Sequence, residues 1–237
     1  MKFSMFLVLL TVTLSSVAQK DTVRSIPMLF RGLGVSVQRF EGLDARIANR
    51  PEYKELRDYA GVLELGWMRS YKRVISGLTL TAGSSMSGDR DEKSSTIRFL
   101  GAGLDFGYDI LPGKFVMLFP LVGIGTQGYK ARFYKDNSDV PFNDVLQFPG
   151  VQNGIRSVDF TNSFFTYRLG LGFNFSSPKH PYSGIGIQAR YTGSFKDQDW
   201  KSSENQTLAG APVDNLSQFQ VALILTTQWR GMKNRMY

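Results

Sequence analysis

The chain has 237 residues, no cysteine, 24 glycines, 31 aromatic residues (18 Phe, 10 Tyr and 3 Trp) and a formal net charge of +8. The absence of cysteine excludes a disulfide framework and any thiol chemistry. The positive charge is scattered without a basic run, so contact with anionic lipid head groups is favoured over nucleic-acid binding. A diffuse charge without any partner is the alternative.

The first 18 residues have the layout of a secretory signal peptide. Lys2 gives the positive end, and an almost unbroken apolar run follows over residues 3–14. Small residues, Ser16 and Ala18, then lie two positions apart, as a cleavage site requires. The run is too short for a membrane-spanning helix, which needs about 20 residues. We predict cleavage after Ala18, leaving a barrel domain of residues 19–237. An uncleaved N-terminal anchor is the alternative.

Eight later segments alternate with a period of two between apolar residues and small or polar ones, which indicates strands with two different faces. They cover about residues 30–40, 59–70, 73–83, 96–108, 115–129, 165–175, 182–195 and 217–230. Their lengths match the roughly nine to eleven residues that a strand needs to cross a bilayer. Only helices and closed barrels satisfy their backbone groups in lipid. The pattern therefore predicts an all-β fold, an eight-stranded antiparallel up-and-down transmembrane β-barrel.

The connections between these segments alternate between long and short. Residues 41–58, 84–95, 130–160 and 196–216 form long connections, whereas 71–72, 109–114 and 176–181 form short turns. The long connections are expected at one end of the barrel, as in outer-membrane barrels with short periplasmic turns and long external loops. In the first long connection, Pro51 is expected to begin one or two helical turns.

The signal peptide, the eight alternating strands and the absence of cysteine resemble the small porin-like barrels of the Bacteroidota, often grouped as PorT-like outer-membrane proteins. The resemblance covers nearly all of residues 19–237 and is one of pattern. It implies location in the outer membrane. The founding member of that family takes part in a protein secretion system, but no residue here specifies that role. The chain departs from the usual terminal Phe, because Trp229 ends the last alternation and a short basic extension follows.

Four charged residues are expected to face the lumen by alternation: Glu64, Asp105, Arg168 and Arg190. A desolvated charge costs several kcal/mol unless it is paired, and an eight-stranded barrel is just wide enough to be filled by side chains. The sequence therefore predicts a packed, charge-paired lumen that is closed to solutes. Glu64 and Arg168 lie near the middle of strands that are opposite in the ring, so they are expected to pair with each other.

Residues 123–128 match G-x-G-x-x-G, the dinucleotide-binding fingerprint. That function needs a helix after the glycines, whereas here they alternate within an expected strand, so glycines lining the lumen are the favoured interpretation.

His180 is the sole histidine and falls in a predicted periplasmic turn, which argues against a catalytic triad or a histidine metal site. The acidic residues of two long connections are interpreted as solvated charge rather than calcium ligands: Asp89, Asp91, Glu92, Asp136, Asp139 and Asp144. We therefore expect no catalytic residues, no metal and no cofactor.

Three functions are left open. The first is a non-enzymatic outer-membrane barrel whose external loops bind or dock a glycolipid, another envelope protein or a larger export assembly. The second is a lipid-modifying membrane enzyme, which would need a clustered catalytic set. The third is a soluble exported lipocalin-like barrel, which would reverse the polarity of the two strand faces.

Overall fold

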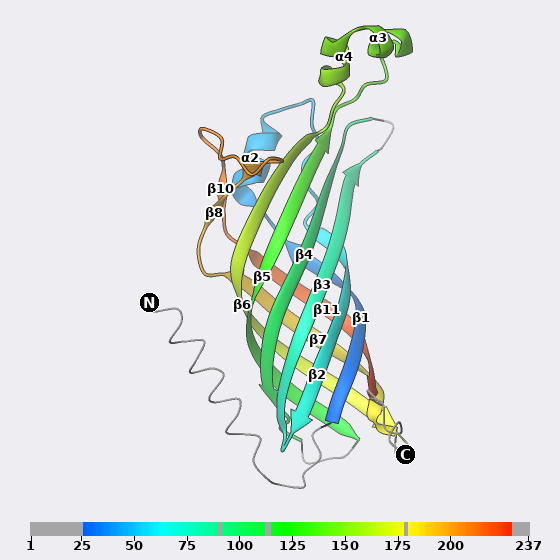
Figure 1. Ribbon diagram of the computed structural model, residues 1–237, viewed down its shortest axis with the longest axis vertical. Helices are drawn as coiled ribbons and strands as arrows, with labels where there is room; N and C mark the ends of the chain where they lie inside the picture. Colours follow the sequence, from blue (N-terminus) through cyan, green and yellow to red (C-terminus); the bar gives the residue numbers. More distant parts are fainter. Residues whose placement is uncertain (1–25, 90–91, 112–114, 178–179, 229–237) are drawn as a thin grey trace, which may run out of the picture.

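The long strands of the chain close into one barrel (Figure 1). The computed structural model describes residues 26–89, 92–111, 115–177 and 180–228. The predicted signal peptide, Asp91 and Trp229 lie outside the described residues.

Eight long strands form the wall: β1 (Ile26–Gln38), β2 (Tyr59–Tyr71), β3 (Val74–Gly88), β4 (Ser94–Tyr108), β5 (Val116–Tyr134), β6 (Val158–Ser177), β7 (His180–Ser194) and β11 (Ser217–Gln228). Each pairs antiparallel with its neighbours along the chain, and β1 pairs with β11 to close the ring. The predicted eight-stranded antiparallel barrel is therefore confirmed. Strands β5 and β6 run further into the third long connection than predicted, and they stay paired as far as Phe133 and Val158.

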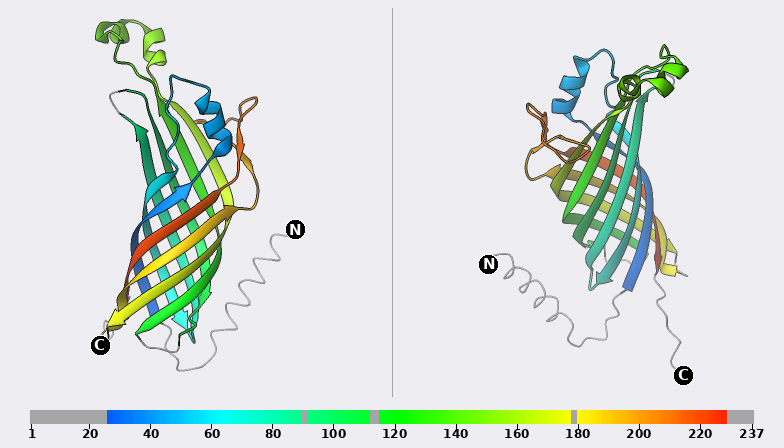
Figure 2. Two further views of the ribbon diagram at one scale, coloured as in Figure 1. Left: turned by 180° about the vertical axis from the view of Figure 1, so that it is seen from behind. Right: turned by 45° about the horizontal axis from the view of Figure 1, so that its top comes forward.

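The shorter elements all belong to the long connections and gather at one end of the barrel (Figures 1 and 2). They are α2 (Glu41–Ala48), α3 (Phe142–Gln147), α4 (Pro149–Gly154), β8 (Gln198–Asp199), β9 (Lys201–Ser202) and β10 (Val213–Asp214). No helix among the described residues has the length and apolarity to cross a membrane. The prediction of a helix that begins at Pro51 is wrong, because the helix of this connection, α2, has already ended at Ala48. Leu43 and Ile47, one turn apart, are both buried, and this burial fixes its position.

The two faces of the strands differ as the alternation predicts. On β1, the side chains of Leu33, Val35 and Val37 are more than half exposed. The alternate residues Ser36 and Gln38 are buried in the lumen. The same apolar outer face continues around the ring on the other long strands. An apolar exterior around a polar middle is the arrangement of a membrane barrel and the reverse of a lipocalin.

The lumen is layered rather than polar throughout, which corrects the sequence-based expectation. At the end of the long connections lies an apolar outer cluster that includes Phe40, Leu43, Tyr129, Phe164 and Trp200. At the short-turn end lies an apolar inner cluster: Met28, Phe30, Met68, Ile75, Phe119, Leu121, Ala222 and Ile224. Polar and charged side chains occupy the layer between the two clusters. Alternation fixes which side a residue faces, but it does not reveal this layering along the barrel.

Candidate functional site

The structure places all four predicted lumen charges inside the barrel, in two ion pairs. Arg190 Nη1 donates to Glu64 Oε1, which also accepts a hydrogen bond of 2.7 Å from Gln220 Nε2. Arg168 Nη1 lies 3.2 Å from Asp105 Oδ2, and Thr79 Oγ1 donates to the same oxygen at 2.7 Å. The expected ion pair between Glu64 and Arg168 is therefore wrong.

The strand register explains the pairing of Arg168 with Asp105. Gly123 on β5 lies directly opposite Asp105 on β4 and opposite Arg168 on β6, so the three residues form one row. A Cβ atom at residue 123 would collide with the Asp105 carboxylate, and one at Gly103 would collide with the Arg168 guanidinium. Glycine at both positions leaves the space in which the two charges meet.

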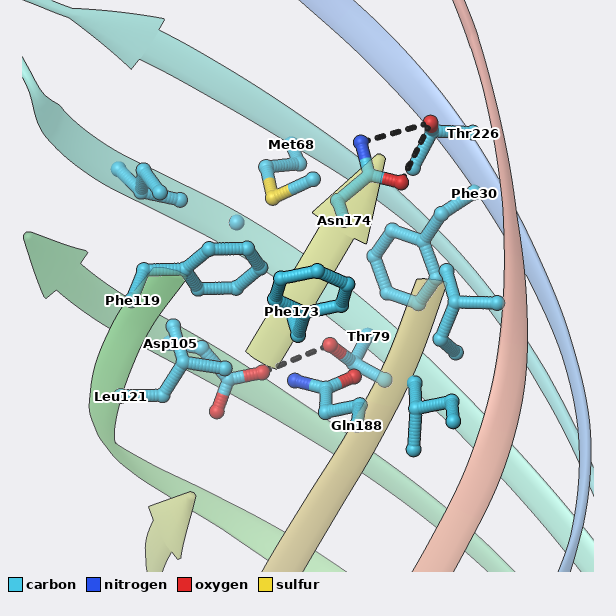
Figure 3. A pocket seen from close by; sticks show the side chains of 14 residues that line it. Phe30, Met68, Thr79, Asp105, Phe119, Leu121, Phe173, Asn174, Gln188 and Thr226 are labelled. Carbon is cyan, nitrogen blue, oxygen red and sulfur yellow. Dashed lines mark hydrogen bonds between the residues drawn. The ribbon is translucent and has the colours of Figure 1, made fainter. Parts of the chain in front are cut away.

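Hydrogen-bonded polar side chains fill the lumen around these pairs. Gln218 accepts from Gln127 Nε2 at 3.0 Å and donates to Gln38 Oε1 at 2.7 Å. Nearer the short turns, Asn174 Nδ2 donates to Thr226 Oγ1 at 3.1 Å (Figure 3). Two hollows in the described part of the lumen measure about 30 Å³ and about 10 Å³. These volumes are comparable with single water molecules rather than with a solute.

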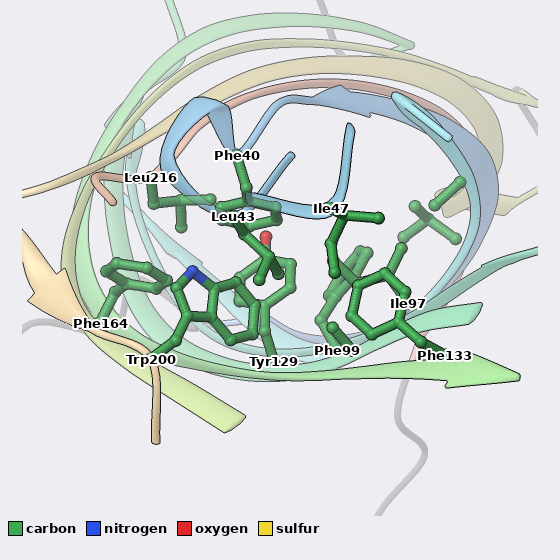
Figure 4. Packing of buried hydrophobic residues seen from close by; sticks show 13 residues of the cluster. Phe40, Leu43, Ile47, Ile97, Phe99, Tyr129, Phe133, Phe164, Trp200 and Leu216 are labelled. Atoms are coloured by element: carbon green, nitrogen blue, oxygen red, sulfur yellow. The ribbon is translucent and has the colours of Figure 1, made fainter. Parts of the chain in front are cut away.

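A lid formed by Phe40 and helix α2 covers the outer mouth of the barrel. The ring of Phe40 packs edge-on against Tyr129 and Trp200, at centroid distances of 4.9 and 5.3 Å (Figure 4). Leu43 and Ile47 point from α2 into the same outer cluster (Figure 4). The lid therefore closes the mouth with apolar side chains above the polar layer.

Asp214 in β10 fastens this lid to the last long connection. Its carboxylate accepts hydrogen bonds from the backbone N–H groups of Gly42 at 2.7 Å and Leu43 at 3.0 Å. It also accepts one of 2.7 Å from Trp200 Nε1. The first N–H groups of a helix lack partners within the helix, and no side chain of the lid caps α2. The sequence analysis did not predict this contact, because Gly42 and Asp214 lie 172 residues apart in the chain.

A second carboxylate of the lid has an unusual environment. Burial raises the pKa of Asp44 to about 6, and the negative charges of Asp58, Asp214 and Glu55 add to this effect. A backbone hydrogen bond at Leu56 opposes the rise. The Asp44 carboxyl therefore binds a proton more tightly in the docked lid than it would in water.

Helices α3 and α4 form a tip that projects beyond the barrel mouth (Figure 1). Three large apolar side chains of this tip face solvent: Phe142 is 76% exposed, Leu146 65% and Phe148 53%. Neither helix buries a residue. Such apolar side chains gain nothing from the barrel core, and clustered exposure of this kind marks interaction surfaces.

A cleft of about 710 Å³ opens beside the barrel mouth, where the lid and the last long connection overhang the outer wall. The outward side chains Val37 and Phe219 form its apolar wall, and Arg39, Asp58 and Asp197 contribute charge. The cleft therefore connects the apolar outer wall of the barrel with the charged surface of the loops.

The other sequence motifs are placed as follows, as far as the structure describes them. Residues 123–128 lie within β5, which continues as a strand to Tyr134, so the helix that a dinucleotide site needs directly after the glycines is not formed there. His180 begins β7 at the short-turn end. Within the described ranges, no group of three or more histidine or acidic residues is arranged to hold a metal ion.

The comparisons with known proteins find similarity only in solved structures. No protein-family model matches the chain. No curated protein matches it either. The attachment invasion locus protein Ail of Yersinia pestis is 13% identical, with a TM-score of 0.47 over 86% of this chain and 99% of Ail. Neisserial surface protein A is 8% identical, with a TM-score of 0.49 over 87% and 99%.

The outer-membrane protease OmpT of Escherichia coli is 10% identical, with a TM-score of 0.44 over 90% of this chain and 99% of OmpT. At these identities and scores, the similarities imply nothing about activity or ligand.

Proposed function

We propose that the protein is a non-enzymatic integral outer-membrane barrel, closed to solutes, whose external connections dock a partner protein. Export through the segment 1–18 and a PorT-like relationship to the Bacteroidota barrels belong to the same proposal, on the sequence pattern given above. The apolar outer face of the strands supports insertion in a membrane.

The exposed tip carries the docking proposal. Phe142, Leu146 and Phe148 are exposed apolar side chains at the point farthest from the membrane, in the same connection as Asp136, Asp139 and Asp144. Aromatic side chains in such a setting are typical anchors of protein interfaces. Over residues 135–156, three acids against two bases, Lys135 and Arg156, leave a small negative charge, which favours a protein partner with an apolar pocket and a basic rim.

The docking experiment compares three forms of the protein after cross-linking on intact cells and purification from detergent-solubilised outer membranes. The wild-type protein is expected to retain a specific envelope protein. The variant Phe142→Ser with Leu146→Ser and Phe148→Ser is expected to lose it. Leu208→Ser, at an exposed apolar residue of the last long connection, serves as the control and should retain it. Equal retention by the triple variant would refute docking through the tip.

Closure to solutes is supported by the two apolar clusters and the paired charges between them. In planar bilayers the purified protein is expected to show no large steady conductance. An open-channel current of porin size would refute closure and would favour passive diffusion.

Location and orientation have their own test. The protein should remain with outer membranes after carbonate washing and show heat-modifiable migration on gels. Tags near Ser138 or Ser203 should be accessible on intact cells, and a tag near Lys179 should not. Release by carbonate would refute insertion, and the opposite labelling pattern would reverse the orientation.

The non-enzymatic part of the proposal is tested with the purified protein and outer-membrane glycolipid. Neither release of fatty acid from the glycolipid nor transfer of a group to it is expected, and either activity would refute this part of the proposal.

A further inference from the structure

A group of three basic side chains lies on the outer, lipid-facing side of the barrel wall. Arg98 on β4 and Lys130 on β5 are register partners, and Arg132 follows two residues further along β5. Their neighbours along the strands, such as Phe99 and Ala131, are buried in the outer cluster. By alternation, the three bases therefore point away from the lumen, on strands that lie side by side (Figure 1).

The bases surround a hollow of about 110 Å³ in the outer surface, together with Thr96 and Tyr134. All five side chains that line it carry hydrogen-bond donors, and no carboxylate is among them. Such a lining suits a phosphate group, whose oxygens are acceptors.

Asp159 on β6 holds two of the bases from the side. Its carboxylate lies 2.9 Å from Lys130 Nζ, and it accepts two hydrogen bonds of 2.7 Å from Arg132, one from Nε and one from Nη2. One carboxylate against three bases leaves an excess of two positive charges. Arg98 forms no ion pair with any residue that the structure describes. Asp159 therefore holds the side chains of Lys130 and Arg132 in place, and the net positive charge that remains can attract an anion.

The height of the hollow on the barrel wall narrows the choice of anion. Along β4, Arg98 is followed on the outer face by Leu100, Leu104 and Phe106, which are all strongly exposed. The rings of Phe165 on β6 and of Phe195, the residue directly after β7, stack on the outer face with their centroids 5.1 Å apart. In membrane barrels, an apolar band flanked by a girdle of aromatic residues marks the edge of the hydrocarbon layer, and these residues have that arrangement. The bases lie just beyond this edge, where lipid head groups begin.

We propose that Arg98, Lys130 and Arg132 bind the phosphate group of a phosphorylated glycolipid in the outer leaflet. The site rests on the membrane insertion in the proposed function, but not on docking through the tip. Its role is to fix an anionic lipid against the β4–β5 wall.

The test measures lipid retained by the full-length protein. The protein is reconstituted in nanodiscs of zwitterionic phospholipid with either diphosphorylated or dephosphorylated lipid A, and native mass spectrometry then counts the lipid A molecules that stay bound. The wild-type protein is expected to retain the phosphorylated form and not the dephosphorylated one. Arg98→Gln with Lys130→Gln should weaken retention about 30-fold, taking about 1 kcal/mol for each base near the lipid surface.

Two matched variants separate charge from folding. Arg50→Gln with Lys196→Gln removes two exposed bases elsewhere and should leave retention unchanged. Arg98→Lys with Lys130→Arg keeps both charges at the site and should retain most of the lipid. Heat-modifiable migration confirms that each variant is a folded barrel, so loss of insertion is distinguished from loss of the site.

Three results of the variant and lipid comparisons would overturn the proposal. They are equal retention by the Gln variant at the site, loss of lipid in the charge-preserving variant, and equal binding of dephosphorylated lipid. Displacement of the lipid by millimolar inorganic phosphate would instead assign the hollow to a free anion, and would also overturn it.

Discussion

Arg168 reaches Asp105 across a single intervening strand, and the residue between them on that strand is Gly123. Both side chains are more than nine-tenths buried. The guanidinium and the carboxylate therefore depend on each other and on the missing side chain of the glycine.

Replacing Arg168 with Met should leave the Asp105 carboxylate buried without its counter-charge. The expected loss in the free energy of unfolding is roughly 3–5 kcal/mol, the usual result of breaking a buried pair. Adding Asp105→Asn should recover part of that loss, because the orphaned charge is removed. Urea unfolding in detergent micelles, followed by heat-modifiable migration, measures both changes. Glu64→Gln in place of Asp105→Asn is the control and should recover less. Equal recovery with Glu64→Gln would show that Arg168 depends equally on Glu64.

Gly123→Ala tests the space that the Asp105–Arg168 pair needs. The new methyl group would collide with the Asp105 carboxylate and with backbone of β4, so a loss of about 1–3 kcal/mol is expected from overpacking. Gly128→Ala on the same strand is the matched control, because the nearest atoms to its new methyl group would lie 3.9 Å away. The same urea titration compares them. Similar stabilities would contradict the proposed crowding.

Asp214→Ala should loosen the lid without unfolding the barrel. The change removes the acceptor for Gly42 N–H, Leu43 N–H and the indole of Trp200, and each donor left without a partner costs about 1–3 kcal/mol. Amide hydrogen exchange over residues 41–48 should accelerate at least about tenfold. Asp197→Ala, at an exposed acid of the same connection, should leave the rate unchanged. Acceleration across all strands would instead indicate global destabilisation.

The lid should respond to pH through Asp44. Its pKa is about 6 in the docked lid against an ordinary value of 3.8, so docking is coupled to uptake of a proton. The contribution to docking is fully present below the ordinary pKa and is lost as the pH rises through about 6. After correction for the intrinsic rate, exchange over residues 41–48 should be slower at pH 5 than at pH 8. Asp44→Asn should abolish the difference, and a persistent difference would assign the effect to another group.

The amino-acid sequence determined the wall of the barrel. Alternation has a period of two residues and is therefore a local property, readable on β6 from Phe165 to Phe175 without knowledge of any neighbour. It gave the number of strands, the end that carries the long connections, and the inward side of Glu64, Asp105, Arg168 and Arg190. Alternation predicts that Gly123 lines the lumen, but it does not show that this glycine leaves the space for a particular ion pair.

The tertiary structure decided which residues meet. Partners across a barrel depend on the stagger of every strand between them, and this stagger accumulates around the ring, so Arg190 rather than Arg168 reaches Glu64. The lid depends on contacts between Gly42 and Asp214, 172 residues apart. The sequence around Gly42 and around Asp214 shows no pattern that predicts this contact. An aspartate in a loop can face water or cap a distant helix, and its sequence context is the same in both cases.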